Sequence, residues 1–143
     1  TRATFAAKDA GADVPILLTT DGAVAEAPGF NVVAYVEGEL LSPDRGVLQG
    51  VSCRVMFEIA RDLGIPARYG TLTPDALAAA TEVFLTATSC GLFPVTRLDG
   101  RPVGAGVPGA VTARLLNTYY ARKDAGWCIT PAASIPPLQG FEP

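Results

Sequence analysis

The chain has 143 residues, of which 49% are apolar and 17% charged, and it carries a net charge of −3 and no histidine. Its length suits one domain with a hydrophobic core, and the scarcity of charge indicates an apolar surface that another domain or subunit covers. Without histidine the chain cannot build a Ser-His-Asp or Cys-His nucleophile or a histidine-based zinc site, and its scattered basic residues form no stripe for a nucleic-acid backbone.

No segment approaches the roughly 18 consecutive apolar residues that a membrane helix needs. The start of the chain also lacks the apolar core of a secretory signal, so we expect no membrane partner and take a cytoplasmic location as the default. Cys53, Cys90 and Cys128 lie far apart, without metal-ligand or redox spacing. We therefore expect free, buried thiols and no metal site.

The first third of the chain predicts the end of a helix followed by two pairs of strands. Gly11 is a typical stop for the helix. Asp21-Gly22 and Glu37-Gly38 are hairpin signals, each lying between runs that favour strands. The expected elements are a helix over 1–10 and strands over 15–20, 23–27, 31–36 and 39–42.

The rest of the chain predicts helices and strands in mixed order. Apolar residues spaced by three and four positions mark a helix from Ser52 to Gly64. Thr73 and Pro74 are a typical N-cap and first residue of a shorter helix. Strands are expected over 82–86 and 93–98, a turn at Asp99-Gly100, a helix over 110–123 and an irregular stretch over 129–143. Antiparallel pairs followed by mixed elements favour the α+β class.

Residues 48–52 are the strongest candidate for a binding site, because Gly50 and Ser52 lie where the first long helix is expected to start. A helix start presents unpaired backbone N–H groups and the positive end of the helix dipole, which together bind an anion such as phosphate. Ser52 as an ordinary N-cap explains the same residues equally well. Both interpretations stay open on the sequence alone.

Two further segments could carry chemistry. Residues 86–91 place hydroxyl and small side chains after a buried strand, which is typical of the rim of a ligand site but also of a plain turn. Glu26 lies among apolar and small residues where a strand should end. A buried carboxylate there needs a cationic or hydrogen-bonded partner, and a surface glutamate is the alternative.

Together these segments resemble the class IV, or fold-type IV, pyridoxal-phosphate aminotransferases in order and spacing. The Gly-Phe-Asn at 29–31 and the Val-Pro-Gly at 107–109 look most like the (R)-selective amine transaminases, with branched-chain aminotransferases as the nearest neighbours. The resemblance implies the large carboxy-terminal domain of the D-amino-acid/branched-chain aminotransferase-like fold, a mixed α/β pseudo-barrel. The matching motifs cover 24–31, 42–52, 82–88, 99–104 and 106–112.

The resemblance also implies a role for particular residues. Glu26 would face the pyridine nitrogen of pyridoxal 5'-phosphate, Leu48 would pack against the ring, and the helix start would hold the phosphate. The implied cofactor-binding residues are Glu26, Leu48, Gly50, Val51, Ser52 and Thr88, and Ser89 and Cys90 would border the substrate pocket. Pro28 and Cys53 depart from the family pattern, which usually has serine in the loop after the glutamate and often arginine after the hydroxyl residue.

The family's Schiff-base lysine lies roughly thirty-odd residues before the pyridine glutamate, which puts it upstream of Thr1. Lys8 is only 18 residues before Glu26, in the expected helix, and Lys123 lies far downstream. We therefore expect residues 1–143 to form most of the large cofactor-binding domain of a longer chain. The small amino-terminal domain and the catalytic lysine would be absent from this segment, which alone would be inactive.

For the complete enzyme the resemblance implies transfer of an amino group between an amine or amino acid and a 2-oxo acid, in a homodimer. Two alternatives stay open. One is a catalytically inactive binding protein with the same motifs, and the other is a lyase of the same fold, of the aminodeoxychorismate type.

Overall fold

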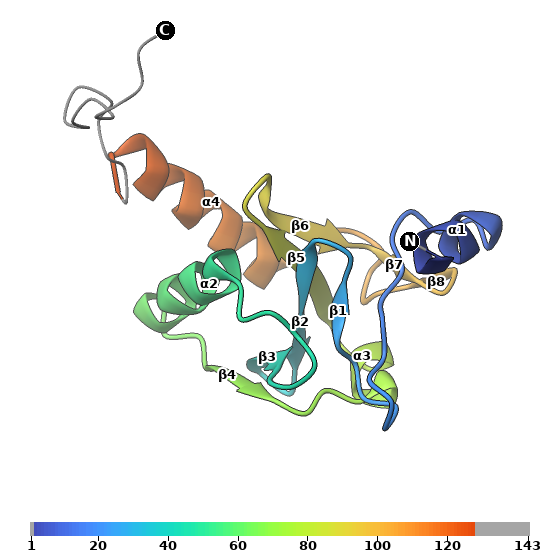
Figure 1. Cartoon of the computed structure of the whole chain (residues 1–143). Helices are drawn as coiled ribbons and strands as arrows, with labels where there is room; N and C mark the ends of the chain where they lie inside the picture. The colour runs from blue at the N-terminus through green and yellow to red at the C-terminus, as the bar shows by residue number, and fades with distance from the viewer. Residues whose placement is uncertain (1, 128–143) are drawn as a thin grey trace, which may run out of the picture.

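The computed structural model describes residues 2–127, which form a mixed sheet with helices on both sides (Figure 1). The sheet has six strands in the order β4-β3-β2-β5-β6, with β1 paired to β2, and β7 and β8 form a separate hairpin. The α+β prediction is confirmed. The elements are α1 (Arg2–Asp9), β1 (Glu26–Ala27), β2 (Phe30–Val36), β3 (Glu39–Pro43), α2 (Val51–Asp62), β4 (Ala67–Gly70), α3 (Pro74–Ala78), β5 (Glu82–Ala87), β6 (Gly91–Val95), β7 (Arg97–Leu98), β8 (Arg101–Pro102) and α4 (Ala110–Asp124).

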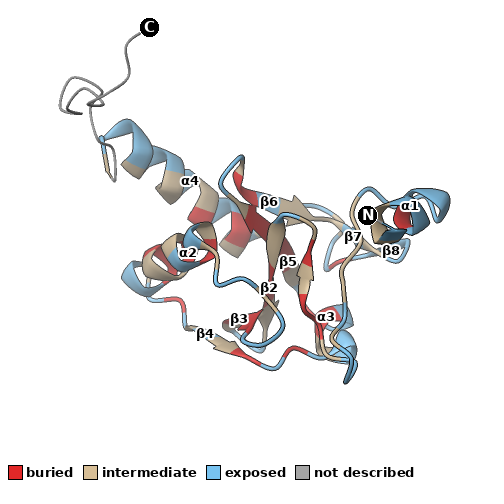
Figure 2. Ribbon diagram, viewed as in Figure 1, coloured by how far each residue is buried: buried red, intermediate tan, exposed pale blue. Residues whose placement is uncertain are grey.

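The sheet separates two hydrophobic clusters because successive side chains of a strand point to opposite faces. Val33 and Phe84 belong to the cluster that α2 and α4 cover, whereas Val32 and Leu85 belong to the cluster on the other face. Figure 2 shows the buried residues of α2 and α4 on the sides that face the sheet. The sheet therefore holds the start of α2 in a fixed place beside its strands.

Most elements confirm the sequence predictions. The turn between β2 and β3 uses left-handed backbone at Glu37 and Gly38, with φ of 51° and 84°. The hydroxyl of Thr73 accepts a hydrogen bond from the Ala76 N–H at 3.1 Å, so Thr73 is the N-cap of α3. In the part of the chain that the structure describes, no helix is long and apolar enough to span a membrane. Cys128 and the expected irregular stretch over 129–143 lie outside the described residues.

The predicted hairpin over 15–20 and 23–27 is shorter than expected. Its arms meet in an isolated bridge between Leu18 and Val24, and of the two predicted strands only Glu26–Ala27 becomes a regular strand. The reason is a bulge in the second arm: the carbonyl of Leu17 accepts the N–H of Ala25 at 2.8 Å, while the N–H of Leu17 donates to the carbonyl of Glu26 at 2.9 Å. Two residues therefore face one, and the regular ladder is interrupted.

The strands after α2 differ from the sequence predictions in two places. β4 was not predicted, because it is short and pairs in parallel with β3, which requires the crossover through α2. The single strand expected over 93–98 is two strands, because β6 pairs with β5 and β7 pairs with β8. The break falls at Thr96, whose carbonyl accepts a hydrogen bond from the Val103 N–H at 3.0 Å.

Candidate functional site

A row of three polar residues crosses adjacent strands next to α2. Asn31 on β2 is the Cα partner of Glu26 on β1 and of Thr86 on β5. Ladder partners project to the same face, and Thr86 shares that face with Phe84 of the α2-side cluster. The row therefore faces the same side of the sheet as α2.

Glu26 finds its hydrogen-bond partner in the loop that leads into α2. Glu26 is half-buried, and its Oε2 accepts a hydrogen bond from the N–H of Leu48 at 3.0 Å. The carbonyl of Leu48 accepts a hydrogen bond from Nδ2 of Asn31 at 2.6 Å. Two neighbouring residues of the sheet thus hold both backbone polar groups of Leu48, whose own side chain is 75% exposed.

The start of α2 is open to an anion. Its N-cap is Gly50, which has no side chain to accept a hydrogen bond, so the alternative of Ser52 as an ordinary N-cap is wrong. The first intrahelical bond runs from the Arg54 N–H to the Gly50 carbonyl at 3.1 Å. The N–H groups of the first turn, including those of Val51 and Ser52, therefore have no acceptor within the helix.

The start of α4 is different, although its N-cap is also a glycine, Gly109. The carboxylate of Glu82 accepts the N–H groups of Val111 at 3.0 Å and Thr112 at 2.7 Å. The carboxylate of Glu82, on β5, therefore already occupies the start of α4. Helix α2 instead starts at a glycine without a side-chain cap, beside the polar row, and the dipole of a helix favours an anion at such a start.

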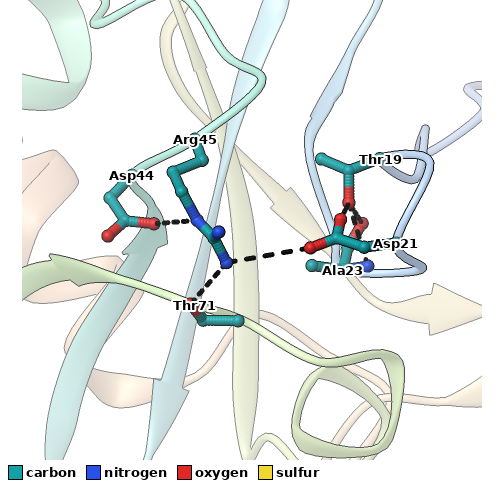
Figure 3. Close-up of polar contacts among 6 residues, drawn as sticks. All are labelled: Thr19, Asp21, Ala23, Asp44, Arg45 and Thr71. Carbon is teal, nitrogen blue, oxygen red and sulfur yellow. Dashed lines mark hydrogen bonds and ion pairs between the residues drawn. The ribbon is translucent and has the colours of Figure 1, made fainter.

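Polar contacts of Arg45 hold the far end of the loop before α2 (Figure 3). Arg45 donates to the hydroxyl of Thr71 at 3.3 Å and pairs with Asp21 at 3.9 Å and with Asp44 at 3.8 Å. The hydroxyl of Thr19 donates a hydrogen bond to the carboxylate of Asp21, and this bond lowers the pKa of Asp21 below the ordinary value. Arg45 therefore connects the loop to the 19–23 turn and to the segment after β4.

A buried polar cluster lies beneath the first turn of α2. The Cys53 thiol donates to the Ser42 hydroxyl at 3.6 Å, and Ser42 donates to the carbonyl of Val32 at 2.8 Å. The Thr86 hydroxyl is buried without a hydrogen-bond partner of ordinary geometry, although it lies near enough to the thiol to affect it. Burial raises the pKa of Cys53, and the neighbouring hydroxyls oppose that rise only in part. The thiol is therefore protonated at neutral pH and is not a nucleophile.

The predictions for the cysteines are confirmed in part. Cys53 is a buried free thiol, as expected, whereas Cys90 is a free thiol that is only half-buried. Among residues 2–127, no group of three or more cysteine, aspartate or glutamate side chains is arranged to hold a metal ion.

The turn between β5 and β6 carries Thr88, Ser89 and Cys90. Thr88 and Ser89 are exposed. The turn follows directly on the end of β5 that pairs with Asn31, and the residue after it, Gly91, lies against the ring of Tyr119 on α4. Contacts bring Glu26, Leu48 and Gly50 together, with Val51 and Ser52 following in the helix, whereas Thr88 to Cys90 share only the same end of the sheet.

Sequence reasoning missed two residues of this region, Asn31 and Arg45. Asn31 stands in the Gly-Phe-Asn motif, but an asparagine at the start of a strand is usually read as a turn residue. Its importance depends on strand register, which places it between Glu26 and Thr86. Arg45 precedes the loop glycine and gave no signal of its own.

Sequence comparison with known proteins shows to which family the chain belongs. The model for amino-transferase class IV matches residues 1–98, more than half of the chain. The chain is 32% identical over 111 residues to a branched-chain-amino-acid aminotransferase of Pseudomonas aeruginosa, covering 77% of this chain and 36% of that protein. It is 37% identical over 106 residues to a probable branched-chain-amino-acid aminotransferase of Thermotoga maritima, covering 73% and 39%. The chain therefore belongs to the class IV aminotransferase family.

Comparison with solved structures leads to the same family. The branched-chain amino acid aminotransferase from Escherichia coli has a TM-score of 0.80 at 30% identity, covering 83% of this chain and 41% of that one. Another branched-chain amino acid aminotransferase, complexed with N-(5'-phosphopyridoxyl)-L-glutamate, has a TM-score of 0.81 at 34% identity, covering 88% and 45%. The fold is thus that of the branched-chain aminotransferases, as expected, and the chain spans less than half the length of the relatives that it matches.

Proposed function

We propose that this chain is the cofactor-holding part of a pyridoxal-phosphate-dependent aminotransferase. The complete protein would move an amino group between an amine or amino acid and a 2-oxo acid. The observation that carries the proposal is the hydrogen bond between Glu26 and the N–H of Leu48, which fixes an acid beside the open start of α2. Family membership supports the same reading, because the relatives that the chain matches are named aminotransferases.

The residues present fit a phosphorylated pyridine. Leu48 and Val51 are three residues apart, and a chain of that length spans at most about 10 Å. The acid and the helix start are thus close enough for one small molecule to reach both. The phosphate would accept hydrogen bonds from the N–H groups of Val51 and Ser52 and from the hydroxyl of Thr88. The exposed side chain of Leu48 would cover one face of the ring.

Pyridoxal phosphate, when bound, supplies a ring that accepts electrons from a carbanion beside the transferred nitrogen. Glu26 would keep a proton on the ring nitrogen, because a negative carboxylate in a dry site favours the protonated, positively charged form. The N–H of Leu48 would keep that carboxylate aimed at the ring. Ser89 and Cys90, in the β5–β6 turn, would border the substrate.

The proton transfers need a base, and among the described residues neither lysine stands at this site. Lys8 lies on α1, and Lys123 lies in the last turn of α4. We propose that the lysine stands in a preceding part of the polypeptide, because the relatives are more than twice as long as the matched segment. A homodimer would cover exposed apolar residues such as Val51 and Phe93.

The test uses the complete polypeptide that carries this chain, with pyridoxal phosphate, an amino donor and a 2-oxo acid. Amino transfer with one new amino acid or amine per donor consumed supports the proposal. Binding of the cofactor without any transfer would show an inactive relative. Release of pyruvate from separately supplied aminodeoxychorismate, with no amino transfer from any donor, would show a lyase. Failure to bind pyridoxal phosphate at all would contradict the assignment of the site.

A further inference from the structure

We propose that Asn31 is the positioning residue that sets the spacing between the two anchors of the cofactor, the acid at Glu26 and the helix start at Gly50. The inference rests on the proposed function and deepens it. Asn31 itself would not touch the reacting atoms. It would act through the backbone of residues 48–50.

Asn31 occupies the centre of the site. It is half-buried on β2, and its register partners are Glu26 on one side and Thr86 on the other. Its Nδ2 donates to the carbonyl of Leu48 at 2.6 Å. Since the N–H of Leu48 donates to Glu26, the peptide groups on both sides of this residue are tied to neighbouring strands.

The other end of the same amide lies against Gly50. A Cβ placed on Gly50 would come within 2.0 Å of Oδ1 of Asn31, which no real contact allows. Gly50 has φ of −68° and ψ of 139°, a conformation that any residue adopts. The backbone therefore does not require glycine here, and the close approach of Asn31 does.

These contacts connect Glu26, the loop before α2 and the start of the helix to one another. Glu26 holds the N–H of Leu48, Asn31 holds its carbonyl, and the Oδ1 of Asn31 packs against the helix start. The distance from the acid to the first turn of α2 then depends on the size and position of one carboxamide. A cofactor that must reach both anchors at once is sensitive to that distance, as is any ligand held in a preorganised site.

The structure offers a matched control at the other glycine N-cap. Gly109 starts α4 with φ of −80°, and a Cβ there would come within 2.0 Å of Glu82 Cδ. A Gly109→Ala substitution therefore crowds a helix start as severely as Gly50→Ala does. It does so at the end of β5 away from Thr86, so it should disturb the fold without touching the cofactor site.

The experiment measures the dissociation constant of pyridoxal phosphate for the complete polypeptide and for the variants Gly50→Ala, Asn31→Ala, the double variant and Gly109→Ala. We expect Gly50→Ala to weaken binding about a hundredfold and Asn31→Ala about tenfold. The double variant should bind about as well as Asn31→Ala, because removal of the amide makes room for the new methyl group. Gly109→Ala should lower the unfolding midpoint and leave the affinity within about twofold of the parent.

Several outcomes would overturn the inference. Additive losses in the double variant would show that Gly50 does not depend on Asn31, and an Asn31→Ala variant with unchanged affinity would show that the amide sets nothing. If Gly50→Ala does not fold, the double variant must fold, and its failure to do so would also contradict the account. A parent protein that binds no pyridoxal phosphate would instead remove the proposed function on which the inference rests.

Discussion

The carboxylate of Glu26 accepts a hydrogen bond from the backbone N–H of Leu48, and the two atoms lie 3.0 Å apart. The residues are 22 positions apart in the chain, on β1 and on the loop before α2. This contact joins the acid of the candidate site to the loop that leads into the glycine N-cap of α2. Substitutions at Glu26 can separate the effect of its negative charge from the effect of this hydrogen bond.

Glu26→Gln and Glu26→Ala should have different effects. Glutamine keeps an oxygen that can accept the Leu48 N–H but loses the negative charge, so we expect amino transfer about a hundredfold slower with little change in cofactor affinity. Alanine removes both, so affinity should fall as well. Steady-state rates and cofactor titrations of the complete polypeptide measure the two quantities. A Glu26→Gln variant that works at the parent rate would contradict the role of the charge.

Arg45→Met should loosen the loop before α2. The cation of Arg45 pairs with Asp21 and Asp44, and all three side chains are largely exposed, so the contacts are weak and salt-sensitive. We expect cofactor affinity to fall about two- to fivefold at low salt. The difference from the parent should vanish near 1 M salt, where charges are screened beyond about 3 Å.

Arg68→Met is the matched control for Arg45→Met. It breaks a shorter ion pair, with Arg68 Nε and Glu39 Oε2 at 2.7 Å, at the β3–β4 edge. Cofactor affinity should not change in this variant at any salt concentration. Equal effects of the two substitutions would show that Arg45 has no special connection with the site.

Glu82→Ala should lower stability without affecting the cofactor. The substitution removes the acceptor for the N–H groups of Val111 and Thr112 at the start of α4, which should cost about 1–2 kcal/mol of the free energy of unfolding. Urea unfolding measures the loss, and Glu39→Ala, which removes one partner of a part-exposed ion pair, should cost less than about 1 kcal/mol. A large drop in cofactor affinity in Glu82→Ala would contradict the separation of the two helix starts.

The pH dependence of stability should report the buried thiol of Cys53. Burial raises its pKa, so the folded protein retains the proton more tightly than the unfolded chain. The resulting stability is complete below the ordinary thiol pKa, near about 8.5, and is lost as the pH rises from there towards the higher pKa of the folded state. The difference in free energy of unfolding between the parent and Cys53→Ala should be constant up to about pH 8 and shrink towards pH 10. A difference that stays constant across this range would contradict the raised pKa.

The sequence was informative wherever structure depends on neighbouring residues. The spacing of apolar residues predicted α2 and α4, and Thr73 with Pro74 predicted the start of α3, because these are local preferences. The Glu37-Gly38 turn was visible for the same reason, since two residues with positive φ close the hairpin. The motifs of the resemblance also include both Glu26 and Leu48, which the structure joins by a hydrogen bond just before α2.

What the sequence could not predict depends on register and on distant partners. β4 forms only because α2 returns the chain beside β3 in parallel. Asn31 gains its place between Glu26 and Thr86 from strand pairing, and a shift of one residue would turn it to the other face. At the N-cap of α2, a Cβ on Gly50 would lie 2.0 Å from Oδ1 of Asn31, so the environment of this glycine depends on a residue far away in the sequence. Patterns among neighbouring residues cannot predict this contact between Asn31 and Gly50.

The most direct test of the account is a crystal structure of the complete polypeptide with pyridoxal phosphate. The account predicts phosphate oxygens at about 2.7–3.2 Å from the N–H nitrogens of Val51 and Ser52, and the pyridine nitrogen at a similar distance from the Glu26 carboxylate. A phosphate bound away from the start of α2, or a Glu26 side chain turned away from the ring, would contradict it.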